Sequence, residues 1–206
     1  THSQSLEKFL CGIDNVLTLA IHSLTDPYAQ MQVAMAEDCP KIIIENKIDY
    51  ARKAPELHEH LQIEQNTSPF GHVKVSPKFN PSHFAIISYG EIARICVDDY
   101  AKIHAATNSI FDVYCLQKLH PLDVSTIAKE IARYEGVLII EDGSLHHGIS
   151  AEVAAQLAEH GFRGTIKRLG ADAVPIPSPK SLEHACLVTT GKIIDAVAQL
   201  LDGDAR

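Results

Sequence analysis

Residues 83–141 read HFAIISYGEIARICVDDYAKIHAATNSIFDVYCLQKLHPLDVSTIAKEIARYEGVLIIE, and this stretch decides the fold. Short apolar runs alternate in it with stretches of helical spacing: strands are expected at 83–88, 111–116 and 137–141, and helices at about 91–105 and 123–134. The alternation continues with a helix at about 148–160, a strand at 165–169 and a last helix at about 189–201. Nearly uninterrupted apolar strands separated by helices are typical of parallel βαβ units. The sequence therefore predicts an α/β protein with a three-layer, mostly parallel sheet.

Capping residues support these boundaries. Asp123 follows Pro121 at the expected start of the second helix, and Gly161 follows the last turn of the third. Towards the amino terminus, strand candidates at 16–20 and 41–45 flank a helix at about 26–36 that starts with Asp26-Pro27. One strand–helix–strand unit cannot bury both of its faces, so we interpret residues 1–51 as the tail of a larger α/β domain.

Residues 52–80 are polar and are interrupted by three prolines and a glycine, and Pro81 follows directly. Such composition is typical of a connection that runs over the surface. We therefore divide the chain into a domain remnant, a linker and a second domain, at 1–51, 52–82 and 83–206.

The composition excludes several classes of protein. The net charge of −8 without a Lys/Arg-rich stretch argues against a nucleic-acid partner, and no apolar run is long enough to cross a membrane. Five scattered cysteines without a CxxC pair argue against disulfides and structural zinc, so a reducing, cytoplasmic location is expected. The sequence starts with Thr1 rather than Met, which we interpret as a sign of a longer parent chain.

Several motifs occur in an order that resembles one enzyme family: HSQSLEKF (2–9), IIIENK (42–47), LHPLDVSTI (119–127), VLIIEDGSLHHGISAEVAAQLAE (137–159) and GADAVPIPSP (170–179). Together they resemble the beta subunit of the 2-oxoacid dehydrogenase decarboxylase component, of the pyruvate, branched-chain and acetoin type. The chain departs from this family at Cys11-Gly12, at His120, where Arg is usual, and at 145–148, where LHHG replaces a Gly-Gly passage. These departures leave the 2-oxoacid open.

The resemblance implies a transketolase C-terminal-like domain preceded by the tail of a thiamine-diphosphate-binding, pyrimidine-type α/β domain. It implies thiamine diphosphate and Mg²⁺ in the full parent assembly, and K⁺ as a further candidate ion. The implied partners are an alpha-type subunit or fused segment, a second copy in a homodimer, and a lipoyl acyltransferase core docked through acidic surface. The family's stretch that activates the cofactor is not in this sequence, so the isolated chain is expected to bind no cofactor and to be inactive.

The resemblance points to His2 as the catalytic and cofactor-binding residue. A histidine at this place in the family lies at the cofactor, and imidazole suits proton transfer because its usual pKa is near neutrality. The alternative is a terminal histidine without a role.

The resemblance also places a monovalent-cation site at Ala34, Met35, Glu37 and Cys39, bound largely through backbone carbonyl oxygens. Carbonyls at a helix end carry partial negative charge and suit a hard cation. An ordinary helix end is the alternative.

For the other polar residues we expect structural roles rather than catalysis or metal binding. Glu45 and Glu141 follow strands, where doubly wound folds place ligands, but we expect solvated turns there. His58-Glu59-His60 and His146-His147 lack the three or four convergent ligands of a metal site, and His120 is interpreted as an interface or capping residue.

Two functions compete with the 2-oxoacid dehydrogenase subunit. One is a transketolase or deoxyxylulose-phosphate synthase-like enzyme, and the other is a non-catalytic α/β assembly module. No GxGxxG, P-loop or GxSxG motif supports a nucleotide-binding protein or a serine hydrolase.

Overall fold

A six-stranded sheet forms the centre of the computed structural model, which describes residues 4–53 and 55–202. The strands follow the order β3-β4-β6-β5-β8-β9. Their bounds are β3 Leu61–Gln65, β4 Val73–Pro77, β5 Phe84–Tyr89, β6 Phe111–Leu116, β8 Gly136–Ser144 and β9 Thr165–Ala171. The last four of these run parallel, while β3 and β4 form an antiparallel hairpin at one edge. The predicted mostly parallel sheet is confirmed.

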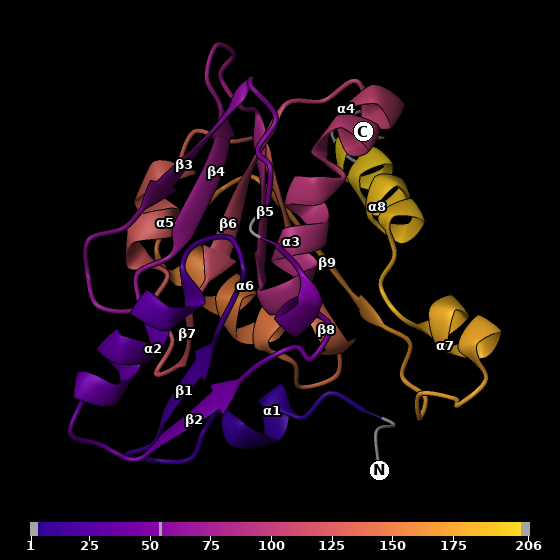
Figure 1. Ribbon diagram of the computed structural model, residues 1–206. Helices are drawn as coiled ribbons and strands as arrows, with labels where there is room; N and C mark the ends of the chain where they lie inside the picture. The colour runs from indigo at the N-terminus through magenta and orange to yellow at the C-terminus, as the bar shows by residue number, and fades with distance from the viewer. Residues whose placement is uncertain (1–3, 54, 203–206) are drawn as a thin grey trace.

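Helices cover both faces of this sheet (Figure 1). One face carries α3 (Gly90–Asp98), α4 (Tyr100–Thr107) and α8 (Thr190–Asp202), and the other carries α5 (Ser125–Glu130) and α6 (Ile149–Glu159). Successive residues of β5 point to opposite faces, so that Ile86 joins the first core and Ile87 the second. This alternation of fully buried residues explains the unbroken apolar run that predicted the strand, and it confirms three layers.

The helix predicted at 91–105 is two helices, because the chain breaks at Asp99. The Asp99 N–H donates to the Ile95 carbonyl (2.9 Å), which ends α3. Its carboxylate accepts from the Thr190 hydroxyl (2.5 Å) and from Lys102. The break therefore places a carboxylate where it holds the first turn of α8.

The polar segment 52–80 is not a simple surface linker. It contains β3 and β4, whose inward side chains Leu61, Val73 and Val75 are buried in the main core. Each strand contributes apolar residues to one face only, and the pattern is therefore weaker than that of the central strands. The prediction failed because it weighted the prolines above this alternation.

A second, three-stranded sheet has the order β2-β1-β7. Its strands are β1 (Leu17–Ala20), β2 (Lys41–Ile44) and β7 (Lys118–His120). The helix α2 (Pro27–Ala36) connects β1 to β2, and the Asp26 carboxylate accepts from the Tyr28 N–H (3.0 Å) as the expected cap. Because β7 follows β6 directly, the two sheets are joined through the chain as well as through packing.

Three shorter elements complete the structure: α1 (Glu7–Leu10), η1 (Asp49–Ala51) and α7 (Lys180–Cys186). The helix α1 precedes β1 and η1 follows β2, while α7 projects beyond β9 on the side of the molecule away from α2 (Figure 1). Within the described residues, no helix has both the length and the apolar character needed to cross a membrane.

Candidate functional site

Parallel α/β sheets bind ligands beyond the carboxyl ends of their strands, and here that edge lies beside α1. A recess of about 400 Å³ opens there. It is lined by α1 and the residues before it, by the end of β8 and by the chain after β9: Gln4, Ser5, Lys8, Asp142, Gly143, Ser144, His146 and 171–176. The motifs at 2–9, 137–159 and 170–179 therefore converge on one place.

Two hydrogen bonds anchor the amino-terminal segment to the end of β8. The Ser5 hydroxyl donates to the Asp142 carboxylate (2.7 Å), and the Lys8 ammonium donates to the Ser144 hydroxyl (2.9 Å). His2 lies outside the described residues, so its place is not shown. The described chain begins two positions after it, at Gln4 on the wall of the recess.

Glu141 is buried, and the expected solvated turn is wrong for this residue. Only 2% of its surface is exposed, and its carboxylate accepts from the Ser150 hydroxyl and from the first N–H groups of α6. These groups carry the positive end of the helix dipole and otherwise lack partners. Burial raises the pKa of Glu141, while the Ser150 bonds and the nearby Arg168 oppose that rise.

Gly148 explains how the carboxylate reaches α6. A Cβ atom at Gly148 would overlap the Glu141 carboxyl group. The glycine in the sequence LHHG therefore serves a close approach between a strand end and a helix start.

A third carboxyl group, that of Glu7, lies in the same region with 8% of its surface exposed. Burial raises its pKa to about 7, and the charges of Asp142 and Glu141 add to that rise. Burial and the Glu7 charge also raise the pKa of the Cys11 thiol to about 11, so this cysteine stays protonated and unreactive near neutral pH. The sequence showed Glu7 only as a charged residue on a short helix, and nothing in it predicted burial.

The predicted cation site lies at the carboxyl end of α2. The Ala34 carbonyl accepts from the Glu37 N–H (3.3 Å), and the Glu37 carbonyl accepts from the Lys41 ammonium (2.9 Å). Met35 is exposed, and Cys39 is half-buried. Each carbonyl oxygen keeps a second lone pair, so the monovalent-cation site stays a prediction.

Side chains do not assemble a metal site in residues 4–53 and 55–202: no group of three or more His, Cys, Asp or Glu is placed to hold an ion. His58 and His60 lie together before β3, with ring centroids 4.9 Å apart, and His147 lies in the loop before α6. His120 pairs with Thr18 in the small sheet, and Glu45 is an exposed acceptor for the Tyr50 hydroxyl (2.8 Å).

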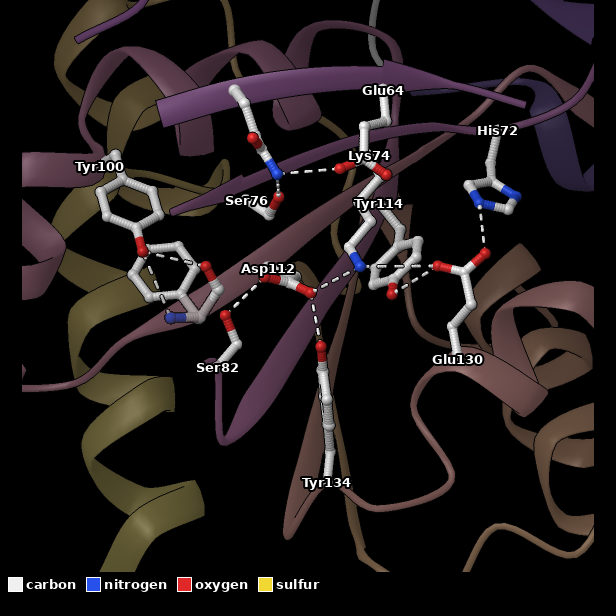
Figure 2. Close-up of polar contacts among 12 residues, drawn as sticks. Glu64, His72, Lys74, Ser76, Ser82, Tyr100, Asp112, Tyr114, Glu130 and Tyr134 are labelled. Atoms are coloured by element: carbon white, nitrogen blue, oxygen red, sulfur yellow. Dashed lines mark hydrogen bonds and ion pairs between the residues drawn. The ribbon is translucent and has the colours of Figure 1, made fainter. Parts of the chain in front are cut away.

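A separate polar network lies at the opposite end of the large sheet (Figure 2). Asp112, near the start of β6, accepts from the Ser82 and Tyr134 hydroxyls (both 2.5 Å) and pairs with Lys74 (3.1 Å). The same ammonium lies 3.7 Å from Glu130. Lys74 comes from β4 and Glu130 from α5, so the network ties the edge hairpin to the helical layer rather than forming part of the recess.

Known proteins resemble this chain over nearly all of its length. The pyruvate dehydrogenase E1 component subunit beta of Dictyostelium discoideum (mitochondrial) is 26% identical over 202 residues, which cover 97% of this chain and 56% of that protein. The corresponding subunit of Rickettsia felis is 25% identical over 204 residues, which cover 97% of this chain and 60% of that protein. The chain thus spans little more than half the length of these relatives.

Solved structures support the same fold. A structure described as "Split gene transketolase, inactive beta4 tetramer" superposes with a TM-score of 0.73 at 16% identity, covering 95% of this chain and 60% of the other. The family described as "Transketolase, C-terminal domain" matches residues 73–193, more than half of the chain and most of the large sheet. The chain therefore belongs to the transketolase C-terminal domain family.

Proposed function

We propose that this chain is the carboxyl-terminal part of the beta subunit of a thiamine-diphosphate-dependent 2-oxoacid dehydrogenase. The observation that carries the proposal is the extent of the similarity to pyruvate dehydrogenase beta subunits. It covers 95–98% of the chain and thus includes α1, β1, α2 and β2, which lie outside the family match at 73–193. An isolated transketolase C-terminal domain would not need those elements.

The whole enzyme would decarboxylate a 2-oxoacid and pass the acyl group to lipoamide. Thiamine diphosphate, when bound, would supply the nucleophilic carbon for the decarboxylation, and an alpha-type partner or fused segment would hold it together with Mg²⁺. The described residues would not form that site by themselves, but would hold in place the segment that leads to it. Ser5 and Lys8 fasten the segment that follows His2, and the Glu141 cap fixes the start of α6 beside it.

In the assembled enzyme, His2 would move protons at the cofactor. The Ser5–Asp142 bond would hold that histidine's segment at the carboxyl edge of β8. K⁺ at the end of α2, a homodimer and a cytoplasmic location belong to the same proposal.

The deciding experiment is reconstitution of the full-length parent protein with its alpha-type subunit. We expect 2-oxoacid-dependent reduction of an artificial electron acceptor that requires thiamine diphosphate and Mg²⁺, and a large loss of kcat in the variant His2→Ala. Turnover of sugar phosphates instead would favour a transketolase or deoxyxylulose-phosphate synthase-like enzyme.

An assembly module is the second candidate function, and exposed apolar side chains near the recess favour it. Leu6, Phe9, Val174 and Leu182 are each more than half exposed. A pure assembly module would bind no thiamine diphosphate by calorimetry, either alone or with the alpha-type subunit, yet would still form a defined oligomer.

Docking of a lipoyl acyltransferase core is proposed for acidic surface near the carboxyl terminus. Asp195 and Asp202 are exposed on α8 and would face a basic binding domain. Charge reversal of both residues should weaken binding of the isolated binding domain several-fold and increase its salt dependence. Unchanged affinity would exclude this surface.

A further inference from the structure

Four buried side-chain atoms lack a hydrogen-bond partner among the described residues: His22 Nε2, Asp49 Oδ1, Ser88 Oγ and Glu91 Oε2. They belong to segments that meet at the junction of the two sheets. His22 follows β1, Asp49 begins η1 after β2, Ser88 is near the end of β5, and Glu91 is in the first turn of α3. Unpartnered buried polar atoms are uncommon, so their concentration at one junction calls for a physical cause.

Asp49 and Glu91 are the centre of this group. Their carboxyl groups are within hydrogen-bonding reach of each other, and only 12% and 10% of the respective side chains are exposed. The Arg52 guanidinium lies 2.5 Å from Glu91 Oε1 and 3.5 Å from Asp49 Oδ1. One guanidinium faces two buried carboxyl groups, and two carboxyl groups so close cannot both ionise without a large cost.

The surrounding groups do not supply a second positive charge. Burial lowers the pKa of His22 to about 4, although Asp49 opposes that change, so the imidazole is neutral near pH 7. Arg94, one turn along α3, is already paired with Asp98 (2.8 Å). Burial and the Asp49 charge raise the pKa of Cys115, on β6, so its thiol stays neutral too.

We propose that Asp49 and Glu91 share one proton and, with Arg52, form a proton-dependent lock between the two sheets. While the shared proton is present, the carboxyl groups bond to each other and the single guanidinium balances the remaining charge. When it leaves, two carboxylates compete for Arg52, and the segment after β2 separates more readily from the first turn of α3. The inference does not depend on thiamine chemistry or on the proposed function.

The direction of the pH effect follows from Glu91. Its pKa is raised to about 7 by burial and by Asp49, with Arg52 opposing. The closed junction therefore holds a proton that the opened junction, at the ordinary value of 4.5, does not. Opening of the junction becomes more favourable as the pH rises from 4.5 towards 7. Proton linkage increases the equilibrium constant for opening by a factor of about ten between roughly pH 6 and 8.

Trypsin can report this opening, because Arg52 and Lys53 are cleavage sites beside the lock. Initial cleavage rates after these residues would be measured on the folded chain between roughly pH 6 and 8, divided by the rate for an unstructured peptide of the same sequence. Hydrogen exchange of the first-turn amides of α3 would follow the same opening without a protease. Two variants remove the shared proton: Glu91→Gln keeps an uncharged donor, and Asp49→Asn leaves Glu91 paired with Arg52 alone.

We expect the normalised rate to rise about tenfold in the unmodified chain and in the control Glu59→Gln, whose side chain is 83% exposed. The rate should be nearly independent of pH in Glu91→Gln, and in Asp49→Asn it should rise clearly less than in the unmodified chain, because burial alone still raises the Glu91 pKa there. A flat rate in the unmodified chain, or an unchanged rise in either lock variant, would overturn the proposal. Far-UV circular dichroism establishes that each variant is folded, and the result in the unmodified chain decides even where one variant is not.

Discussion

Glu7 is a buried carboxyl group whose titration should be visible in the stability of the whole chain. Its folded pKa of about 7 exceeds the ordinary value of 4.5, so the folded state holds the proton more tightly than the unfolded state does. The associated stability is present below about pH 4.5 and is lost as the pH rises through 7. Replacing Glu7 by Gln keeps a neutral side chain of the same shape at every pH.

The magnitude follows from the size of the shift. A shift from 4.5 to about 7, at about 1.4 kcal/mol for each pKa unit, gives a ceiling of roughly 3.4 kcal/mol at high pH. Linkage places about 2.5 kcal/mol of that between roughly pH 5 and 8, and local relaxation would reduce it to about 1–2 kcal/mol. Glu7→Gln should therefore be more stable than the unmodified chain at pH 8 by about that amount, and nearly equal to it at pH 5.

The assay is urea unfolding at several pH values, with the free energy of unfolding compared between variants at each pH. The control is Glu56→Gln, which removes the same charge at an exposed position. A constant difference between Glu7→Gln and the unmodified chain from pH 5 to 8 would refute the argument, because it would show that Glu7 is ionised in the folded state throughout. So would destabilisation of Glu7→Gln at pH 8.

Three further contacts, at the start of α6, in the Asp112 network and at the start of α2, can be tested by the free energy of unfolding. Gly148→Ala should displace the buried Glu141 carboxylate from the start of α6 and lower the free energy of unfolding by about 2 kcal/mol. The control Gly191→Ala, in an open position on α8, should be neutral or stabilising by about 0.5 kcal/mol. Equal effects of the two substitutions would contradict the close approach of Glu141 to Gly148. Lys74→Met leaves the buried Asp112 carboxylate without its cation and should lower the free energy of unfolding by about 3 kcal/mol. Asp112→Asn should cost less. A larger loss in Asp112→Asn would show that the ion pair is not needed for stability. Asp26→Ala should cost about 1 kcal/mol through loss of the α2 cap, and no loss would mean that water replaces the cap.

Much of the fold could be predicted because its central strands are buried on both faces. The runs at 111–116 and 137–141 required no tertiary information, since the parallel strands β6 and β8 read as continuous apolar sequence. The helix caps at Asp26 and Gly161 could likewise be predicted from neighbouring residues in the sequence. The hairpin β3–β4 was missed because it lies at the edge, where polar residues interrupt the apolar ones and Pro69 lies between the strands.

The candidate site was less accessible to sequence reasoning, because its groups come from distant parts of the chain. The motifs at 2–9, 137–159 and 170–179 were recognised by their order along the chain, and only the structure shows that residues from all three line the recess beside α1. The environment of each side chain was not predictable. Glu141 follows a strand as Glu45 does, yet one caps a helix in the interior and the other is exposed.

The difference between these two glutamates has a physical origin that sequence spacing does not show. Glu141 is followed seven positions later by Gly148, whose missing Cβ leaves room for the carboxylate at the start of α6. After Glu45 the chain turns instead into η1, and the next carboxylate, Asp49, meets Glu91 from a separate strand–helix unit. The carboxyl groups of Glu141 and Glu91 each lie at the first turn of a helix, α6 and α3, that follows a parallel strand. The carboxyl edge of the large sheet thus concentrates buried negative charge, and helix dipoles, Arg52 and Arg168 balance it. Burial raises the pKa of both Glu7 and Glu91 to about 7. These two carboxyl groups could therefore supply proton transfer near neutral pH to a site at this edge.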